Sequence, residues 1–229
     1  MSKINIAIDG PSGAGKSTIS DLLAKKLGYI HLDTGAMYRT VAFMAIRNNI
    51  GLDDEDRLVE MIRGLKFEQK LDGSIWCNDE NISLDIRQNE ISMAASRVSA
   101  LNGVRKQLVA LQQDISKEGG YIVDGRDICE VVLPDAEVKV YLTASSDCRT
   151  RRRIAQNADK GIDSDYESIK KTIEDRDYQD MHREHSPLVQ AKDATLIDSS
   201  DMSIEEVVDY LYKMAKEKCD VVVMEVSSQ

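Results

Sequence analysis

The sequence predicts an α/β fold in which helices flank a parallel β-sheet. The first observation is an apolar, β-branched run that ends at Asp9 and leads through a glycine-rich turn into an amphipathic stretch. The second is that a short apolar run at 29–33 again leads into a helical pattern. Strands that alternate closely with helices favour parallel pairing. The third is a change at about 53–99, where short strand patterns and the turn Asp72-Gly73 indicate a small antiparallel insertion.

The elements follow from the spacing of apolar residues and from turn signals. Parallel strands are expected at 3–9, 29–33, 121–124, 138–142 and 195–198, and insertion strands at 65–68, 74–77 and 80–83. Helices are expected at 17–27, 34–49, 56–63, 90–97, 104–115, 146–156 and 166–184, and a last one starts at Ser203, where Glu206 completes a capping-box pattern. Trp76 is interpreted as the core of the insertion, and the sequence leaves open whether 220–229 is a frayed tail or an edge strand.

These elements divide the chain into a core, an insertion and a lid. The core comprises 1–52 and 101–219, the inserted subdomain 53–100, and the lid lies at about 149–165 within the core. A chain of 229 residues with 42% hydrophobic residues suits this arrangement or two small domains. The remaining residues, 220–229, form a tail.

The turn after the first strand matches a phosphate-binding loop. Its sequence fits Gly-x-x-x-x-Gly-Lys-Ser at every defined position. Glycines let successive N–H groups point at an anion, and the following helix adds the positive end of its dipole. Lys16 supplies charge for the β- and γ-phosphates, and Ser17 a hydroxyl for Mg²⁺. Nucleoside triphosphate binding is expected at Gly10, Pro11, Ser12, Gly13, Ala14, Gly15, Lys16, Ser17 and Thr18.

Charge and cysteine usage exclude several classes of protein. A net charge of −10 argues against general nucleic-acid binding and anionic membranes, so local arginines must hold any anionic ligand. The four cysteines form no CxxC pair, and His31, His182 and His185 are too dispersed for zinc, which makes them surface or supporting residues. The chain starts in a strand pattern without a signal peptide. We expect a cytoplasmic monomer without a membrane span.

Polar residues collect at the expected carboxyl ends of the strands, where ligands of parallel sheets bind. Asp33, Thr34 and Arg39 follow the second strand and should lie near the loop. Asp124 either organises a Mg²⁺ shell or caps a turn. Arg126 can fork onto a phosphate while Asp127 accepts hydrogen bonds from a base or sugar, or the two form a surface ion pair.

The expected lid helices carry many arginines. Arg176, Asp180 and Arg183 share one helix face at i, i+4 and i+7, which by itself is typical of a solvated ladder. The preceding helix carries Arg149, Arg151, Arg152 and Arg153. Two such helices joined by a polar break could close over phosphates and exclude water. No Asn-Lys-x-Asp guanine motif occurs, and the chain is short for a motor, so a small kinase with an anionic acceptor is favoured.

Four motifs in order resemble the bacterial cytidylate kinase family. They are 10–18, Leu32-Asp-Thr-Gly-Ala-Met-Tyr-Arg39, Asp124-Gly-Arg-Asp127 and Arg176-Asp-x-x-Asp180-x-x-Arg183, and the similarity runs from about Ile4 to Lys216. The resemblance implies a five-stranded parallel core of the phosphate-loop NTPase type, a monophosphate-binding insertion and a helical lid. It also implies transfer of the ATP γ-phosphoryl group to CMP or dCMP, with Mg²⁺.

The resemblance also assigns residues to the second substrate. Ser96, Arg105 and Asp127 match readers of cytosine, although the first two lie in less distinctive sequence. Contacts to the monophosphate are implied for Thr34, Arg39 and Arg126, and contacts near the sugar for Arg176 and Asp180. Lys16, Arg126, Arg176 and Arg183 are the expected catalytic cations, and Ser17 and Asp124 the expected metal ligands. The alternatives are a kinase of UMP or of a metabolite, and a nucleotide-binding regulatory module without transfer activity.

Overall fold

The computed structural model describes residues 3–70, 72–159 and 161–226 of the chain. The strands are β1 (Ile6–Asp9), β2 (Ile30–Asp33), β3 (Phe67–Gln69), β4 (Ile75–Cys77), β5 (Glu80–Asn81), β6 (Tyr121–Gly125), β7 (Val138–Thr143) and β8 (Thr195–Asp198). The α-helices are α1 (Lys16–Leu27), α2 (Thr34–Arg47), α3 (Glu55–Arg63), α4 (Asn89–Val98), α5 (Asn102–Ser116), α6 (Ser146–Ala158), α7 (Tyr166–His182) and α8 (Ile204–Val226). A 3₁₀ turn, η1 (Asp85–Arg87), and a π-helical turn, η2 (Ile128–Val132), complete the elements.

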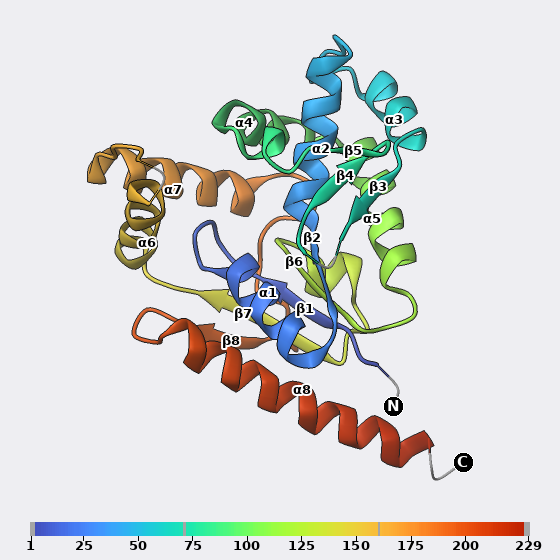
Figure 1. The fold of residues 1–229 in the computed structure, drawn as a ribbon, viewed down its shortest axis with the longest axis vertical. Coiled ribbons are helices and arrows are strands. Elements are labelled where there is room, and N and C mark those ends of the chain that lie inside the picture. Colours follow the sequence, from blue (N-terminus) through green and yellow to red (C-terminus); the bar gives the residue numbers. More distant parts are fainter. Residues whose placement is uncertain (1–2, 71, 160, 227–229) are drawn as a thin grey trace.

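The main sheet has five parallel strands in the order β2-β6-β1-β7-β8. Ile8 of β1 pairs with Asp124 of β6 on one side and with Val140 of β7 on the other. The second sheet, β3-β4-β5, is antiparallel. The expected α/β fold with a small antiparallel insertion is therefore confirmed. All five parallel strands direct their carboxyl ends to one edge, where the phosphate loop begins (Figure 1).

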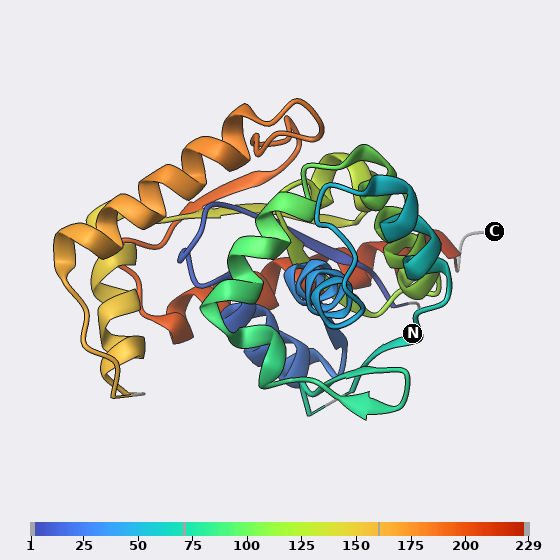
Figure 2. The same ribbon diagram turned by 90° about the horizontal axis from the view of Figure 1, so that it is seen from above.

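Helices cover both faces of the main sheet, as the alternation in β1 requires. Ile6 and Ile8 pack with side chains of α1 and α8, whereas Ala7 faces the cluster built by α2 and α5. Helices α6 and α7 form a separate pair at one side of the molecule, and the blue loop after β1 lies between this pair and the rest (Figures 1 and 2). The carboxyl edge of the sheet therefore lies between the α6–α7 pair and the insertion (Figures 1 and 2).

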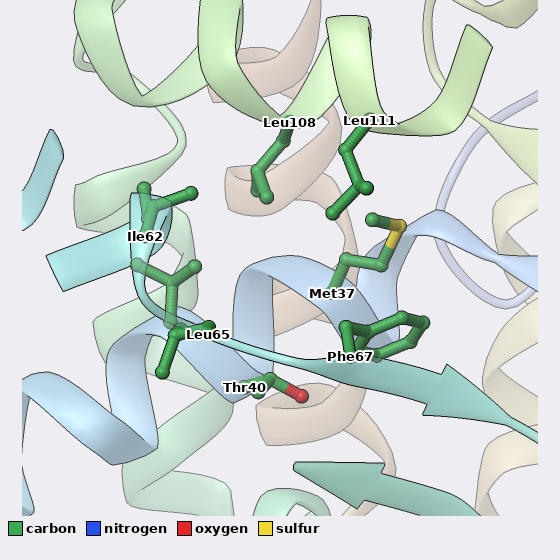
Figure 3. A pocket seen from close by; sticks show the side chains of 8 residues that line it. Met37, Thr40, Ile62, Leu65, Phe67, Leu108 and Leu111 are labelled. Carbon is green, nitrogen blue, oxygen red and sulfur yellow. The ribbon is translucent and has the colours of Figure 1, made fainter. Parts of the chain in front are cut away.

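The insertion shares its core with the main sheet. Leu58 of α3 and Ile86 of η1 belong to the same buried cluster as Val123 of β6 and Met37 of α2. A cavity of about 10 Å³ lies in this shared core and is lined almost entirely by apolar side chains (Figure 3). A cavity of this size and lining holds at most one water and has few polar groups to bind it. The insertion is thus packed against the sheet, and its boundaries at 53 and 100 stay predictions.

Two expectations about local structure are wrong. Trp76 is only partly buried, and the ammonium of Lys70 lies 3.6 Å from its ring centroid. The buried positions of this sheet are instead Ile75 and Cys77, because successive strand residues point to opposite faces. The stretch from 220 continues helix α8 to Val226, in place of a frayed tail or an edge strand, and 227–229 lie outside the described residues. Ser203 and Glu206 form the expected capping box at the start of this helix.

The shared core gives a stability prediction for a matched pair of residues. Ile86 is 1% exposed and Leu84, two positions earlier, is 82% exposed. Ile86→Ala should lower the free energy of unfolding by about 2–5 kcal/mol in one urea transition, since it leaves a cavity in a core that both parts share. Leu84→Ala should change it by less than about 0.5 kcal/mol. Two separate transitions, or equal effects of the two variants, would contradict a shared core.

Candidate active site

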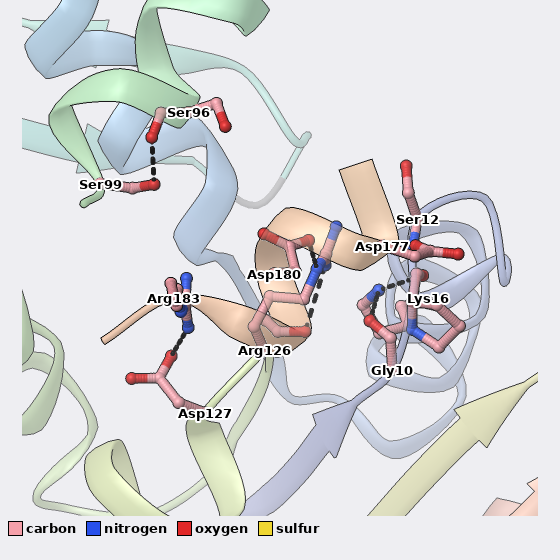
Figure 4. A network of polar contacts seen from close by, with 12 residues as sticks. Gly10, Ser12, Lys16, Ser96, Ser99, Arg126, Asp127, Asp177, Asp180 and Arg183 are labelled. Carbon is pink, nitrogen blue, oxygen red and sulfur yellow. Dashed lines mark hydrogen bonds and ion pairs between the residues drawn. The ribbon is translucent and has the colours of Figure 1, made fainter. Parts of the chain in front are cut away.

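The phosphate loop connects β1 to α1 at the carboxyl edge of the sheet. Gly13 and Gly15 adopt positive φ values of 76° and 93°, which residues other than glycine rarely adopt. The buried ammonium of Lys16 donates hydrogen bonds to the carbonyls of Gly10 at 2.7 Å and Pro11 at 2.9 Å (Figure 4). Burial, together with repulsion from Arg126, lowers the pKa of Lys16 to about 7. An anion in the loop would offset this destabilisation of the charged amine.

Side chains of α6 and α7 hold the backbone of the loop. Asp177 of α7 accepts a hydrogen bond from the N–H of Ser12 at 2.9 Å, and it also pairs with Arg149 of α6 (Figure 4). The guanidinium of Arg149 donates to the carbonyl of Ser12 at 2.8 Å. Asp177 belongs to the motif at 176–183, but sequence reasoning assigned it no role, because a carboxylate on a charged helix is usually solvated. Of the four arginines in α6, Arg149 thus supports the loop.

Of the other arginines of α6, one supports the loop and two are exposed at the surface. Arg152 donates to the carbonyl of Ser199 at 2.6 Å and to that of Ala14 at 3.4 Å, so it links the loop to the residue after β8. Arg151 and Arg153 are exposed. The four arginines of α6 therefore differ in burial, whereas the sequence pattern treated all four alike.

Asp124 lies buried at the end of β6, where three elements meet. Its Oδ2 accepts a hydrogen bond from the Ser17 hydroxyl at 3.0 Å, and its Oδ1 is 2.6 Å from Nε2 of His31. A carboxylate and a hydroxyl side by side are the oxygen donors that Mg²⁺ prefers, and this ion takes its remaining ligands from phosphates and water. The donor set therefore fits the ion that the sequence motif implies.

His31 is buried, which excludes the surface position considered for it and agrees with the supporting role that was the other alternative. Its Nδ1 lies 2.6 Å from a carboxylate oxygen of Asp21, and its Nε2 contacts Asp124. Burial by itself lowers the pKa of this ring, but the hydrogen bonds to Asp124 and Asp21 outweigh burial and raise the pKa to about 10. No sequence signal marked this contact, since His31 occupies an ordinary position in a short strand.

Three arginines lie beyond the loop toward the insertion. Arg39 pairs with Asp33 at 2.9 Å. Arg126 pairs with Asp180 at 2.6 Å (Figure 4). Arg176 has no ion-pair partner within 4.0 Å in the described part of the chain. Burial and repulsion from Arg126 lower its pKa to about 10. The charge of Arg176 therefore lacks compensation, which is the electrostatic condition of a site for an anion.

A second buried charge cluster surrounds Asp127. Its carboxylate pairs with Arg105 of α5 and lies 3.6 Å from a guanidinium nitrogen of Arg183. Burial and the nearby Arg105 lower the pKa of Arg183. The structure thus brings Arg105, Asp127 and Arg183 together, although they come from three separate segments. The surface ion pair considered for Arg126 and Asp127 is wrong, because each pairs with a different partner in the interior.

Two further expected substrate residues, Thr34 and Ser96, take part in hydrogen bonds within the protein. The buried hydroxyl of Thr34 donates to the carbonyl of Asp124 at 2.8 Å and so joins α2 to β6. Ser96 lies on α4 apart from the Asp127 cluster, and its carbonyl accepts a hydrogen bond from Ser99 (Figure 4). Among the remaining expected residues, Arg126 pairs with Asp180, and Asp127 pairs with Arg105 and lies near Arg183.

A family model described as cytidylate kinase matches residues 6–217. The chain belongs to the cytidylate kinase family. A cytidylate kinase of Caldicellulosiruptor bescii is 49% identical over 223 residues, which cover 94% of this chain and 99% of the relative. A cytidylate kinase of Streptococcus suis is 46% identical over 224 residues, with 96% of this chain and 100% of the relative covered.

Solved structures resemble this member of the cytidylate kinase family in fold alone. An uncharacterized protein from Eubacterium ventriosum superimposes with a TM-score of 0.53 at 11% identity and covers 94% of this chain and 99% of its own. Within the described ranges, no helix combines the length and the apolar character that crossing a bilayer requires. The family membership therefore rests on the sequence matches, and the likeness to the solved structure concerns the fold.

The buried imidazolium gives a pH prediction. The pKa of His31 is about 10 in the fold against 6.5 ordinarily, so its contribution to stability is complete below about pH 6.5 and is lost as the pH rises toward 10. The stability difference between wild type and His31→Gln, measured by urea unfolding, should therefore shrink between pH 6.5 and 10. Exposed His182 provides the control, and His182→Gln should show no such trend. A pH-independent difference for His31→Gln would contradict the charged ring.

Proposed function

We propose that this chain transfers the γ-phosphoryl group of ATP to CMP or dCMP, giving ADP and CDP or dCDP. The single observation that carries the proposal is a row of buried and half-buried cations near the carboxyl edge of the sheet. It starts at Lys16, passes Arg126 and Arg176, and ends at the Asp127 cluster. The names of the close relatives support the same reaction. A cytoplasmic location and a monomeric state remain predictions from the sequence.

The donor half of the site is the loop at 10–18. Its N–H groups and the start of α1 favour the phosphates of ATP, and Lys16 can exchange its carbonyl partners for phosphate oxygens. Ser17 and Asp124 would hold Mg²⁺, which neutralises charge on the β- and γ-phosphates when bound. The loop therefore serves the phosphates, and specificity for the acceptor must come from elsewhere.

The acceptor phosphate suits the arginines between the loop and Asp127. Asp33 holds the guanidinium group of Arg39 in place, and Asp180 holds that of Arg126. Arg176 contributes a charge that no ion pair compensates among the described residues. Held arginines need little reorganisation when negative charge spreads over the transferring group. The attacking atom is already an anionic phosphate oxygen at neutral pH, so the reaction requires no general base. We assign the catalytic charge to Lys16, Arg126, Arg176 and Arg183.

The base end is chemically suited to cytosine. Cytosine presents an amino donor where uracil presents a carbonyl, and a carboxylate accepts from the former and repels the latter. Asp127 is such a carboxylate, and the pair with Arg105 holds it in place. We assign base recognition to Asp127, Arg105 and Ser96, and sugar contacts to Asp180 and Arg176. Thr34 is assigned to the monophosphate, together with Arg39 and Arg126. The insertion at 53–100 and the lid at 149–165 would enclose the acceptor and the donor.

An acceptor panel tests the proposed reaction. ADP production from ATP should require CMP or dCMP, and UMP, AMP and shikimate should support much less in the same coupled assay. Turnover of UMP or shikimate without CMP would favour another small-acceptor kinase. Binding of ATP without ADP production from any acceptor would favour a regulatory nucleotide-binding module.

Lys16 should act on phosphate charge rather than on stability. Lys16→Ala should lower kcat by about 10²-fold or more, the usual loss for one preorganised charge donor, with an unchanged melting temperature. Lys26 lies on the same helix and pairs with Asp209 at the surface, so Lys26→Ala is the matched control and should retain activity. Full activity of Lys16→Ala in steady-state kinetics would contradict the donor assignment.

A substitution of Asp127 should show whether this residue recognises the base or only stabilises the fold. Asp127→Asn keeps the shape of the side chain but offers an amide, so the KM for CMP should rise about 10-fold or more while the KM for ATP changes less than about threefold. Asp193, which forms an exposed ion pair with Lys139, gives the control variant Asp193→Asn. Equal losses for both substrates of Asp127→Asn would indicate a structural role.

A further inference from the structure

His31 is a buried side chain to which the proposed reaction assigns no role. Its side chain is 6% exposed and lies between Asp21 of α1, whose side chain is 49% exposed, and Asp124 of β6, whose side chain is 5% exposed. Both contacts measure 2.6 Å, one at each ring nitrogen. A strand, a helix and the strand that ends in the expected metal ligand are thus joined through one ring.

The chemistry of the two partners fixes what the ring must donate. An ionised carboxylate only accepts hydrogen bonds, so each ring nitrogen must carry a proton to bond both partners. A neutral imidazole can donate to only one of them. A proton on Nε2 lets His31 donate to Asp124, and the contact at Nδ1 ties the ring to Asp21.

This contact determines how Asp124 can present its oxygens. Oδ1 is bonded to His31, and the Ser17 hydroxyl lies against Oδ2 at 3.0 Å. With Oδ1 anchored, the carboxylate cannot turn without losing a charged hydrogen bond in the interior. Beside it lies a polar cavity of about 150 Å³, lined among others by Ser17, Asp21, His31 and Arg39. A cavity of this size and polarity has room for several water molecules, as a hydrated ion requires.

We infer that His31 is a positioning residue for the metal that accompanies the nucleotide: it holds Asp124 so that Oδ2 faces the Ser17 hydroxyl, and Asp21 holds His31. The inference rests on the Mg²⁺-ATP half of the proposed function. Partners that orient a metal ligand through hydrogen bonds typically change metal affinity about 10–100-fold when removed. His31 does not touch the phosphates in this account, so its effect must appear only when metal is present.

The test compares nucleotide binding with and without metal. Calorimetric titration with β,γ-imido-ATP, in excess Mg²⁺ and separately in excess EDTA, gives the factor by which Mg²⁺ tightens binding. For His31→Gln this factor should fall about 10-fold or more, while affinity in EDTA stays within about twofold of wild type. Asp21→Asn should reduce the factor by a smaller amount, and His182→Gln, at an exposed histidine, should leave it unchanged.

Several outcomes would overturn the inference. One is an unchanged factor in His31→Gln, and another is a loss of affinity of equal size in Mg²⁺ and in EDTA, which a merely structural role would produce. If His31→Gln does not fold, Asp21→Asn decides, because its side chain is half exposed and does not touch Asp124. The titration contains no acceptor, so a wild type that fails to turn over CMP contradicts the proposed reaction but leaves this test intact.

Discussion

The site depends on the buried aspartate at the end of β6. Asp124 binds Ser17 of α1 and His31 of β2 through its carboxylate, and its backbone carbonyl accepts from Thr34 of α2. A buried carboxylate without such partners would be strongly destabilising. Each partner therefore fixes one element relative to the sheet edge. Asp124 thus links the start of α1, the second strand and the second helix at one point.

The second constraint is that several cations of the site are destabilised by burial and by one another, although the protein as a whole is acidic. The chain carries a net charge of −10, yet burial and neighbouring arginines lower the pKa values of Lys16, Arg176 and Arg183. Those groups are less stable as cations in the free protein than in water. Bound phosphates would remove this penalty, so the fold is arranged for a highly charged ligand pair before either substrate arrives.

Local constraints explain how much of the fold and site the sequence could predict. The loop was found because its glycines are required by local geometry. A Cβ at Gly10 would lie 1.9 Å from the carbonyl oxygen of Leu142 in β7, so no other residue fits there. Strand periodicity and the capping box at Ser203 likewise act over a few residues. These features gave the sheet, most helices and the positions of Asp33, Asp124 and Arg126 at strand ends.

Long-range partners explain what the sequence could not predict. Ser12 and Asp177 are 165 positions apart, and a carboxylate on a charged helix carries no sign that it binds a loop backbone. His31 reads as an ordinary strand residue until Asp21 and Asp124 surround it. The shared core of the insertion also arises only after folding, because Leu58 and Val123 lie in distant segments. Residues that hold a site in place are thus harder to predict from the sequence than the motifs of the site itself.

A crystal structure with CMP, ADP and Mg²⁺ bound tests the central claim most directly, since it locates both substrates on one sheet edge. The account predicts the cytosine amino group at the Asp127 carboxylate, the CMP phosphate among Arg39, Arg126 and Arg176, and the metal at Ser17 and Asp124. CMP bound with its phosphate at Asp127 and its base beside Arg39, or bound outside this row of cations, would contradict it.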